Sequence, residues 1–279
     1  MPEFDAGAFG RGQRGQGGKV VHWQELWRHE LLDALAHDPI VIVPCGSVEQ
    51  HGPHSPMDVD ISHTQALATA TALAIEAFPV LVAPPLWLGL AHYNLGEVGT
   101  ITASVETYLA LVSDVVGSIW ANGFRRIICL NGHGGNRDIL RVISVKLAEA
   151  DIWMLPITYW EMVPEMMAAT AERDGANVGH GGEWENSLQL YLRPEMVDTE
   201  RMVFDPPRQP EFSDDILAFT HFPERRRERE HGVMGDPFVA TAEKGQLLFE
   251  AARDKLIEVC RQYHELPVRG YREFGSHCP

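Results

Sequence analysis

A short polar segment contains the first residues whose types suit metal binding. Glu49 and His51 follow an apolar run, with His54 and Asp60 just beyond them. Residues two apart in an extended segment point to the same side, so the Glu49 carboxylate and the His51 imidazole can face one cation. The turn at Gly52-Pro53 lets Asp60 return to that place, and its two oxygens suit the bridging of two metals. Taken alone, the segment could equally be an ordinary polar loop.

A second segment places a histidine between glycines. His133 lies in the run Asn131–Asn136, directly after an apolar stretch. Glycines beside a histidine let the backbone approach a ligand closely. The alternative is a plain turn from strand to helix, in which the Asn136 side chain caps the helix.

A third segment, residues 180–187, reads His-Gly-Gly-Glu-Trp-Glu-Asn-Ser and opens a predicted helix. On its own, His180 could be an ordinary loop histidine, and Asn186 or Ser187 could simply cap the helix. Together, the three segments supply histidines and carboxylates, a mixture that suits Zn²⁺ or Mn²⁺. Two such ions, about 3.5–4 Å apart, would clamp a bridging hydroxide and a substrate oxygen.

Strands and helices alternate around these segments. Short, continuously apolar runs predict buried strands at 39–44, 80–83, 126–130 and 152–157. Apolar residues at helical spacing predict helices at 22–37, 104–121, 137–149 and 240–263, and a shorter one through Ser187 to Tyr191. This α/β alternation is typical of a parallel sheet with helices on both faces, where the site lies beyond the carboxyl ends of the strands.

Composition excludes several classes of partner. The chain has 279 residues and a formal net charge of −16, which repels phosphate backbones and anionic lipid. We therefore expect no nucleic-acid and no membrane partner. Four cysteines without a CxxC pair indicate free thiols and a reducing, cytoplasmic setting. Residues 1–19 are predicted to form a flexible tail, 20–265 a single domain and 266–279 a second tail.

Read as one pattern, the three segments resemble the creatininase (creatinine amidohydrolase) family. The matching motifs are Pro44-x-Gly46-Ser-x-Glu49-Gln50-His51-Gly52-x-His54 with Asp60, then Asn131-Gly-His-Gly-Gly-Asn136, then His180-Gly-Gly-x-x-Glu185-x-Ser187. Weaker similarities are Gly99-Thr100-Ile101 and Ala242-x-Lys244-Gly245. They run in the family's order from about residue 22 to 262, so nearly the whole chain is covered.

The resemblance implies a three-layer αβα fold with a mostly parallel central sheet, a binuclear metal centre and assembly as a hexamer. In the matched motifs, Glu49 and His133 correspond to ligands of one metal. His51 corresponds to a ligand of the second metal, and Asp60 to the carboxylate that bridges both.

The same resemblance indicates residues on the substrate side. His180 matches a histidine that handles substrate and proton transfer. Trp160 matches a substrate-side tryptophan, and residues 89–94 fall where family members line the pocket. A role in a surface loop is an equal alternative for His92 and Tyr93. The candidate substrate contacts are therefore His54, His92, Tyr93 and Trp160.

Two departures from the family pattern matter. Creatininases carry a glutamate two residues after the histidine of the second segment, as a ligand of the second metal, and Gly135 stands there in this chain. We expect Glu185 to fill that role, with Glu183 in reserve, and we place both beside His180 as candidate catalytic residues. A tryptophan found shortly before that histidine in creatininases is Ala176 here. One wall of a creatinine pocket is thus missing.

The sequence therefore predicts a metal-dependent hydrolase in which metal-bound hydroxide attacks the carbonyl of a small cyclic amide or related ring. His180 or a neighbouring glutamate would move the proton to the leaving group. One alternative is a hydrolase that opens an oxidised cyclitol ring by C–C cleavage. Another is a non-catalytic protein that binds metal or ligand on the same fold. The predicted cofactors are two Zn²⁺ or Mn²⁺ ions, and the predicted partners are a small-molecule substrate and further copies of the chain.

Overall fold

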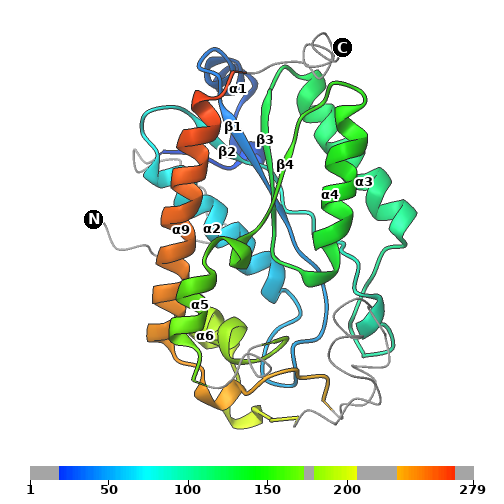
Figure 1. The fold of residues 1–279 in the computed structure, drawn as a ribbon, viewed down its shortest axis with the longest axis vertical. Coiled ribbons are helices and arrows are strands. Elements are labelled where there is room, and N and C mark those ends of the chain that lie inside the picture. The colour runs from blue at the N-terminus through cyan, green and yellow to red at the C-terminus, as the bar shows by residue number, and fades with distance from the viewer. Residues whose placement is uncertain (1–18, 173–178, 206–230, 268–279) are drawn as a thin grey trace, which may run out of the picture.

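A four-stranded parallel sheet forms the middle of the protein, in a computed structural model that describes residues 19–172, 179–205 and 231–267 (Figure 1). The strands are β1 (Ile40–Cys45), β2 (Val80–Val82), β3 (Arg126–Asn131) and β4 (Leu155–Thr158), in the order β2-β1-β3-β4. β1 pairs with β3 along its whole length. Parallel neighbours need a crossover segment between successive strands, and helices supply most of these crossovers.

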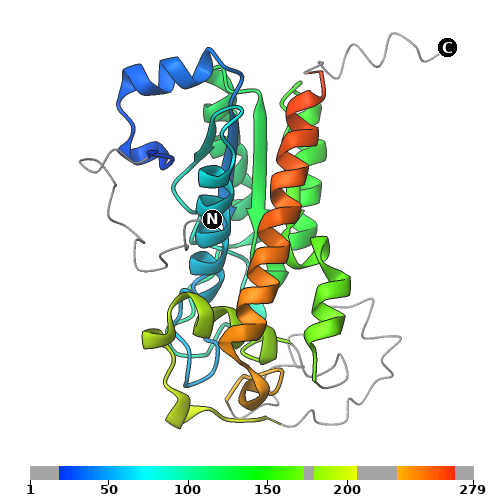
Figure 2. The same ribbon diagram turned by 90° about the vertical axis from the view of Figure 1, so that its left-hand side faces the viewer.

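Helices cover both faces of this sheet. One face packs against α2 (Val59–Ala74), α6 (Glu183–Leu192) and α9 (Ala242–Glu265), and the other against α3 (Val105–Ala121) and α4 (Arg137–Ala148). A short helix, α5 (Pro164–Thr170), contacts α9. Figure 2 shows α9 running along the length of the domain. These layers confirm the predicted αβα architecture with a parallel central sheet.

Alternate side chains of the strands build two separate cores. Ile40 and Ile42 of β1 pack in the core formed with α2, α6 and α9, whereas Val41 and Val43 pack in the core formed with α3 and α4. Every residue of β1 is buried, which explains why its sequence is continuously apolar. Because each strand is packed between two cores, the loop that follows it begins at a fixed position.

The predicted helix at 22–37 is wrong in its extent. The segment forms a 3-10 turn, η2 (Trp23–Glu25), and a separate helix, α1 (Arg28–Leu35), with extended backbone at Trp27 between them. The Glu30 side chain accepts a hydrogen bond from the Trp27 backbone N–H, and this cap starts the second helix. Trp27 is consequently 60% exposed instead of lying on a buried stripe.

The sequence patterns did not predict α2, the helix that contains Asp60. Most of its residues are buried, including the polar Thr64. A helix buried nearly all the way round has no polar stripe, so the helical period is hard to recognise. The predicted strand at 152–157 also begins later than expected, at Leu155.

The two predicted tails lie almost wholly outside the described residues, so their flexibility stays a prediction. Lys19, the last residue of the first tail, is anchored to the end of α2. Its Nζ donates to the carbonyl oxygens of Ala72 and Ile75, at 2.7 and 2.5 Å. Within the described ranges, no helix is long and apolar enough to cross a membrane.

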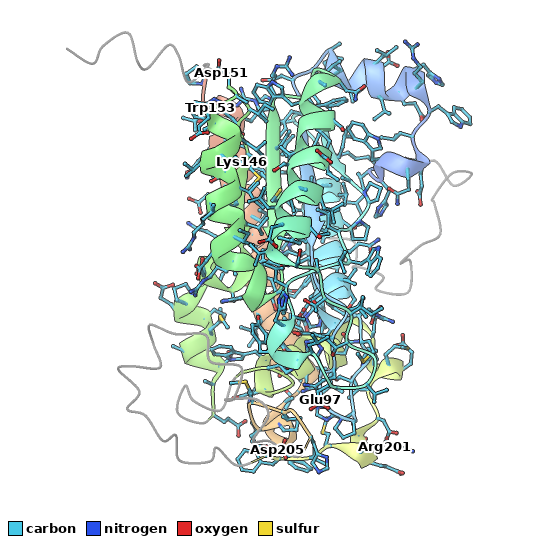
Figure 3. All side chains as sticks on the ribbon, turned by 90° about the vertical axis from the view of Figure 1, so that its right-hand side faces the viewer. Glu97, Lys146, Asp151, Trp153, Arg201 and Asp205 are labelled. Carbon is cyan, nitrogen blue, oxygen red and sulfur yellow. The ribbon has the colours of Figure 1, made fainter. Side chains whose placement is uncertain are left out.

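The parallel strands share one direction along the domain. Asp151 and Trp153, just before β4, mark the end where the strands begin, while Glu97, Arg201 and Asp205 mark the opposite end (Figure 3). The loops that follow the strands meet at this second end. A site at the carboxyl ends of the strands is therefore built there.

Candidate metal centre

The first group of possible metal ligands consists of Glu49, Asp60 and His133, which are at most 2% exposed. His133 Nδ1 lies 3.1 Å from Glu49 Oε1 and 3.0 Å from Asp60 Oδ2. Glu49 follows β1, His133 follows β3, and Asp60 lies in the first turn of α2. Two paired strands and the helix packed on them thus bring the three side chains together.

A second group shares Asp60 with the first and adds His51 and Glu185. His51 Nε2 lies 3.3 Å from Asp60 Oδ1 and 3.5 Å from Glu185 Oε2. Glu185 comes from the first turn of α6, where its carboxylate accepts a hydrogen bond from the Gly181 backbone N–H at 2.7 Å. Each oxygen of Asp60 therefore faces a different group, as a carboxylate that bridges two ions must.

Backbone carbonyls fix the orientation of both ligand histidines. His51 Nδ1 lies 3.0 Å from the Glu49 carbonyl oxygen, and His133 Nε2 lies 3.1 Å from that of Leu90. A ring nitrogen that donates to a carbonyl carries the proton, so the other nitrogen presents its lone pair. The atoms that could bind a metal are thus Nε2 of His51 and Nδ1 of His133, the two nitrogens that face the carboxylates.

His180 lies beside the second group. Its ring packs against that of His51 with centroids 4.3 Å apart, and its Nδ1 lies 3.4 Å from Glu49 Oε1. Its Nε2 donates to the Gln50 carbonyl oxygen at 2.5 Å. Glu49, His51 and His180 also form a third, overlapping group of possible ligands. Nδ1 is therefore the His180 atom that can exchange a proton at the cluster.

The electrostatics of the cluster favour positive charge. Burial opposes the charged form of His51, but the carboxylates of Glu185 and Asp60 outweigh it and raise its pKa to about 9. The pKa of His133 is likewise raised well above its usual value, against burial, by Glu49. Burial would raise the pKa of Asp60, yet the two imidazoles hold that pKa well below its usual range.

Two buried atoms show that the residues of the cluster fit metal ions. Among the described residues, His51 Nε2 and Asp60 Oδ2 find no hydrogen-bond partner of acceptable geometry. A buried polar atom without a partner costs free energy, and both of these atoms would be metal ligands. Three carboxylates in one cluster also need compensating positive charge. The residues therefore fit divalent cations, and Asp60 is shared by two of the ligand groups.

Two asparagines fix the loop that carries His133. Asn131 Oδ1 accepts from the His133 backbone N–H at 3.0 Å, and its Nδ2 donates to the His133 carbonyl oxygen at 2.8 Å. Asn136 Nδ2 donates to the Gly46 carbonyl oxygen, and its Oδ1 accepts from the Leu90 N–H, both at 3.0 Å. Asn136 makes no side-chain cap on α4, so the reading of this loop as a simple capped turn is wrong.

The structure places Glu183 apart from the cluster, although we predicted it as a reserve ligand and catalytic residue. Glu183 is fully buried and binds Lys244 Nζ at 2.6 Å. Helix residues two apart face different sides, so Glu183 and Glu185 do not both reach the metals. Ser187 Oγ accepts from the Thr241 N–H at 3.2 Å and thereby joins α6 to α9.

Neighbouring atoms fill the space beside Gly135. A Cβ at this position would lie 2.1 Å from the Leu90 carbonyl oxygen and 2.3 Å from Tyr93 Oη. Tyr93, a predicted substrate contact, lies 3.4 Å from His133 Nε2. A longer side chain at 135 does not fit unless this loop moves. The carboxylate of the second group comes from Glu185 instead.

The other predicted substrate contacts lie outside the ligand groups. His54 is buried, and its Nε2 lies 3.2 Å from the Gly181 carbonyl oxygen, in the loop that leads to α6. Trp160 packs edge-on against Tyr159, with ring centroids 5.1 Å apart. His92 is exposed on the 3-10 turn η3 (His92–Asn94). Ala176 lies outside the described residues.

Asn94 contacts the cluster and Tyr159 interacts with its charges, although we did not assign either residue from the sequence. Asn94 Nδ2 donates to Glu49 Oε2 at 2.5 Å. Burial, followed by the charges of Glu185 and Asp60, raises the pKa of Tyr159 well above its usual value. Asn94 lies within the segment 89–94 and Tyr159 lies next to Trp160, both of which the family resemblance had indicated, and that position was the available signal.

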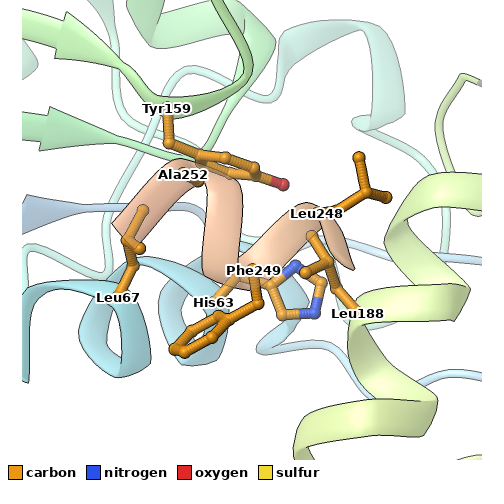
Figure 4. A pocket seen from close by; sticks show the side chains of 7 residues that line it. All are labelled: His63, Leu67, Tyr159, Leu188, Leu248, Phe249 and Ala252. Atoms are coloured by element: carbon orange, nitrogen blue, oxygen red, sulfur yellow. The ribbon is translucent and has the colours of Figure 1, made fainter. Parts of the chain in front are cut away.

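A small cavity lies beside the cluster, between α2, α6 and α9. It is lined by His63, Tyr159, Leu67, Leu188, Leu248, Phe249 and Ala252 (Figure 4). Its volume has room for about one water molecule, which is too little for a substrate. His63 Nε2 lies 3.1 Å from Gln189 Oε1, and burial lowers the His63 pKa to about 4. The histidine that lines this cavity is therefore neutral at ordinary pH.

The domain matches known hydrolases over most of its length. A family model described as creatinine amidohydrolase (creatininase) matches residues 24–260. Creatinine amidohydrolase of Pseudomonas putida is 28% identical over 262 residues, or 88% of this chain and 97% of the relative. The 3-dehydro-scyllo-inosose hydrolase of Thermotoga maritima is 27% identical over 88% of this chain and 84% of its own length. A mycofactocin precursor peptide peptidase of Mycobacterium tuberculosis is 31% identical over 78% and 83%.

Solved structures agree with these matches. A crystal structure of creatinine amidohydrolase is similar with a TM-score of 0.77 at 26% identity, and the match covers 90% of this chain and 100% of the other. Two further creatininase structures are described as the Mn and the Zn-Zn forms. Fold and ligand groups together define a metal-dependent hydrolase on a three-layer αβα scaffold. The chain belongs to the creatininase family, and the non-catalytic alternative finds no support.

Proposed function

We propose that this enzyme hydrolyses an amide C–N bond in a small, cyclic substrate at two divalent metal ions. The position of Asp60 is the observation that carries the proposal. Its two oxygens face His51 on one side and His133 on the other, at 3.3 and 3.0 Å. A carboxylate shared by two ligand groups is the arrangement that holds two ions next to each other. Bound ions would supply an activated water and polarise the substrate carbonyl.

Four side chains besides Asp60 would hold the ions, namely Glu49, His51, His133 and Glu185. Asn94 keeps the Glu49 carboxylate oriented by donating to its second oxygen. His180 would hold a proton at Nδ1 and pass it to the leaving nitrogen, because its Nε2 is engaged by the Gln50 carbonyl oxygen. Tyr93, at the edge of the first group, would contact the substrate.

The similar proteins support cleavage of an amide bond, but they do not point to one particular substrate. Two of the similar proteins are named as an amidohydrolase and a peptide peptidase, both of which cut C–N bonds. The relative named as an inosose hydrolase is 27% identical over 88% of this chain, and it favours a second candidate. That candidate is the opening of an oxidised cyclitol ring by C–C cleavage.

We further propose Zn²⁺ or Mn²⁺ as the ions and a homo-oligomer as the assembly. Imidazole and carboxylate ligands suit both metals. Exposed apolar side chains support self-association, because one stretch of chain places Leu95, Val98, Ile101 and Val105 at the surface with exposed fractions of 47–96%. Light scattering on the purified protein would give the number of subunits.

The test of the proposed function combines metal content with a substrate panel. The purified protein is reconstituted with Zn²⁺ or Mn²⁺, and metal per subunit is measured. Creatinine and other cyclic amides, a short peptide and a cyclic 1,3-diketone are then offered. We expect two ions per subunit, and amide cleavage that a chelator abolishes and added metal restores. Ring opening of the diketone alone would favour the second candidate, whereas activity that survives complete metal removal would overturn both.

A further inference from the structure

We propose that Lys244 is a positioning residue of the metal centre, which fixes the first turn of α6 through Glu183 and thereby places the Glu185 carboxylate. The inference rests on the proposed metal-dependent function. It concerns a contact between α6 and α9, on the side of α6 away from the ligands. The weak family similarity at 242–245 contains this lysine, and neither ligand group includes it.

The Lys244 ammonium group is fully engaged. Its Nζ donates to Glu183 Oε1 and to Glu172 Oε1, both at 2.6 Å, and to the Val239 carbonyl oxygen at 2.8 Å. An ammonium group has three donors, so these contacts use all of them. The side chain is 14% exposed. Its position is therefore fixed by three acceptors instead of varying with solvent.

Lys244 is the cationic partner of the Glu183 carboxylate. The Glu183 carboxylate is fully buried, and besides Lys244 it accepts a hydrogen bond from the Glu172 backbone N–H at 3.1 Å. A buried carboxylate is stable only if it is paired and hydrogen-bonded. Glu172 precedes His180 in the chain, and Glu183 follows it. The contacts of Lys244 therefore connect the chain on both sides of His180.

The first turn of α6 is held between two partners. Residues two apart on a helix point to different sides, so Glu183 faces Lys244 while Glu185 faces His51. Any rotation of this turn that loosens the Glu183 contact also moves the Glu185 carboxylate. The lysine can therefore act on the ligand without touching it.

Close packing of the two helices strengthens this argument. A Cβ at Gly245 would lie only 1.9 Å from the Ser187 carbonyl oxygen, so the first turn of α9 lies directly against α6. Ser187 Oγ and the Thr241 N–H form a further hydrogen bond there, at 3.2 Å. Unlike Glu49 and His133, Glu185 does not follow a strand, so its position depends on what α6 packs against, which is chiefly α9.

The test compares Lys244→Met with a matched control at the other end of the sheet. The control, Arg126→Met, removes a cation whose Nε lies 2.9 Å from Asp38 Oδ2, at the first residue of β3. Metal per subunit, competition with a chelator, kcat, KM and Tm are measured for wild type and both variants. We expect Lys244→Met to bind its second ion about tenfold more weakly and to lose kcat in proportion, because changes outside the ligand shell cost about 10–100-fold. Arg126→Met should lower Tm alone.

A second pair of variants keeps the test decisive. Lys244→Arg retains the charge and should recover most of the metal affinity. If Lys244→Met fails to fold, Glu183→Gln removes the buried charge while keeping the shape, and it should also weaken the second ion. Two tightly bound ions and an unchanged kcat in a folded Lys244→Met or Glu183→Gln protein would overturn the inference. Wild type that binds no metal would instead overturn the proposed function.

Discussion

The two ligand groups differ in what holds them. Glu49 and His133 follow paired strands at the centre of the sheet and are 1% and 2% exposed. Glu185 lies in the first turn of a ten-residue helix outside the sheet, and its side chain is 24% exposed. The sheet thus fixes one group before any metal binds. In the other group, Glu185 depends on packing between α6 and α9.

This difference predicts unequal metal affinities. A preformed site loses little conformational freedom on binding, whereas a ligand on a helix end must first be held in place. We therefore expect the ion held by Glu49, Asp60 and His133 to bind more tightly than the ion held by His51, Asp60 and Glu185. Variants of the shared and the separate ligands can break or sharpen the comparison.

Asp60→Asn should have the largest effect, because Asp60 belongs to both groups. The amide keeps the shape but removes the charge and one of the two bridging oxygens. We expect both ions to bind weakly and kcat/KM to fall by more than about 100-fold, since changes outside the ligand shell already cost about 10–100-fold. Elemental analysis after dialysis, together with steady-state kinetics, would measure this. Two retained ions with full activity would refute the bridging assignment.

Glu185→Gln and Glu49→Gln should separate the two groups. We call Glu49, Asp60 and His133 the strand-supported group. We expect Glu185→Gln to retain about one tightly bound ion, because this group stays intact. Glu49→Gln should weaken the tighter ion and also disturb the contact with Asn94. Metal titration of both variants under identical conditions measures the difference. If both variants lose metal equally, the two sites bind as one unit and the comparison fails.

Gly135→Ala should disturb the strand-supported group by displacing His133. The added Cβ would lie 2.1 Å from the Leu90 carbonyl oxygen and 2.8 Å from His133 Nε2, so the contact that orients His133 must shift. We expect about a tenfold loss of kcat/KM and a stability loss of about 1–3 kcal/mol. Gly134→Ala is the matched control, since its Cβ would meet no described atom within 4 Å. Equal behaviour of the two variants would show that the loop adapts freely.

The sequence predicted much of the fold and the strand-supported group because the signals there are local. Glu49 and His133 each follow a continuously apolar run, and that pattern marks the carboxyl end of a buried strand. The helix containing Asp60 was missed because its burial hides the helical period. The separate roles of Glu183 and Glu185 follow from the tertiary contact with Lys244. A contact between residues so far apart in the chain leaves no local pattern.

Two buried histidines, His51 and His63, also differ in their surroundings. His51 faces carboxylates, whereas His63 lies in the small apolar cavity, where burial lowers its pKa to about 4. A histidine with a lowered pKa contributes stability that is present above about pH 6.5 and is lost as the pH falls toward 4, because the unfolded chain binds the proton first. His51, with its raised pKa of about 9, contributes stability below about pH 6.5 that is lost only as the pH rises toward 9.

The pH range below 6.5 therefore isolates the contribution of His63 to stability. Chemical unfolding of metal-free protein is measured at pH 7 and pH 5 for wild type and His63→Gln. We expect wild type to lose about 2 kcal/mol more than the variant over this range, because about 1.5 pH units of it lie between the pKa of the unfolded chain and pH 5. Acidic groups titrate alike in both proteins, so the difference between them cancels those contributions. Parallel pH profiles would mean that the cavity admits enough water to keep His63 near its ordinary pKa, and the apolar support behind Asp60 would then have to be reconsidered.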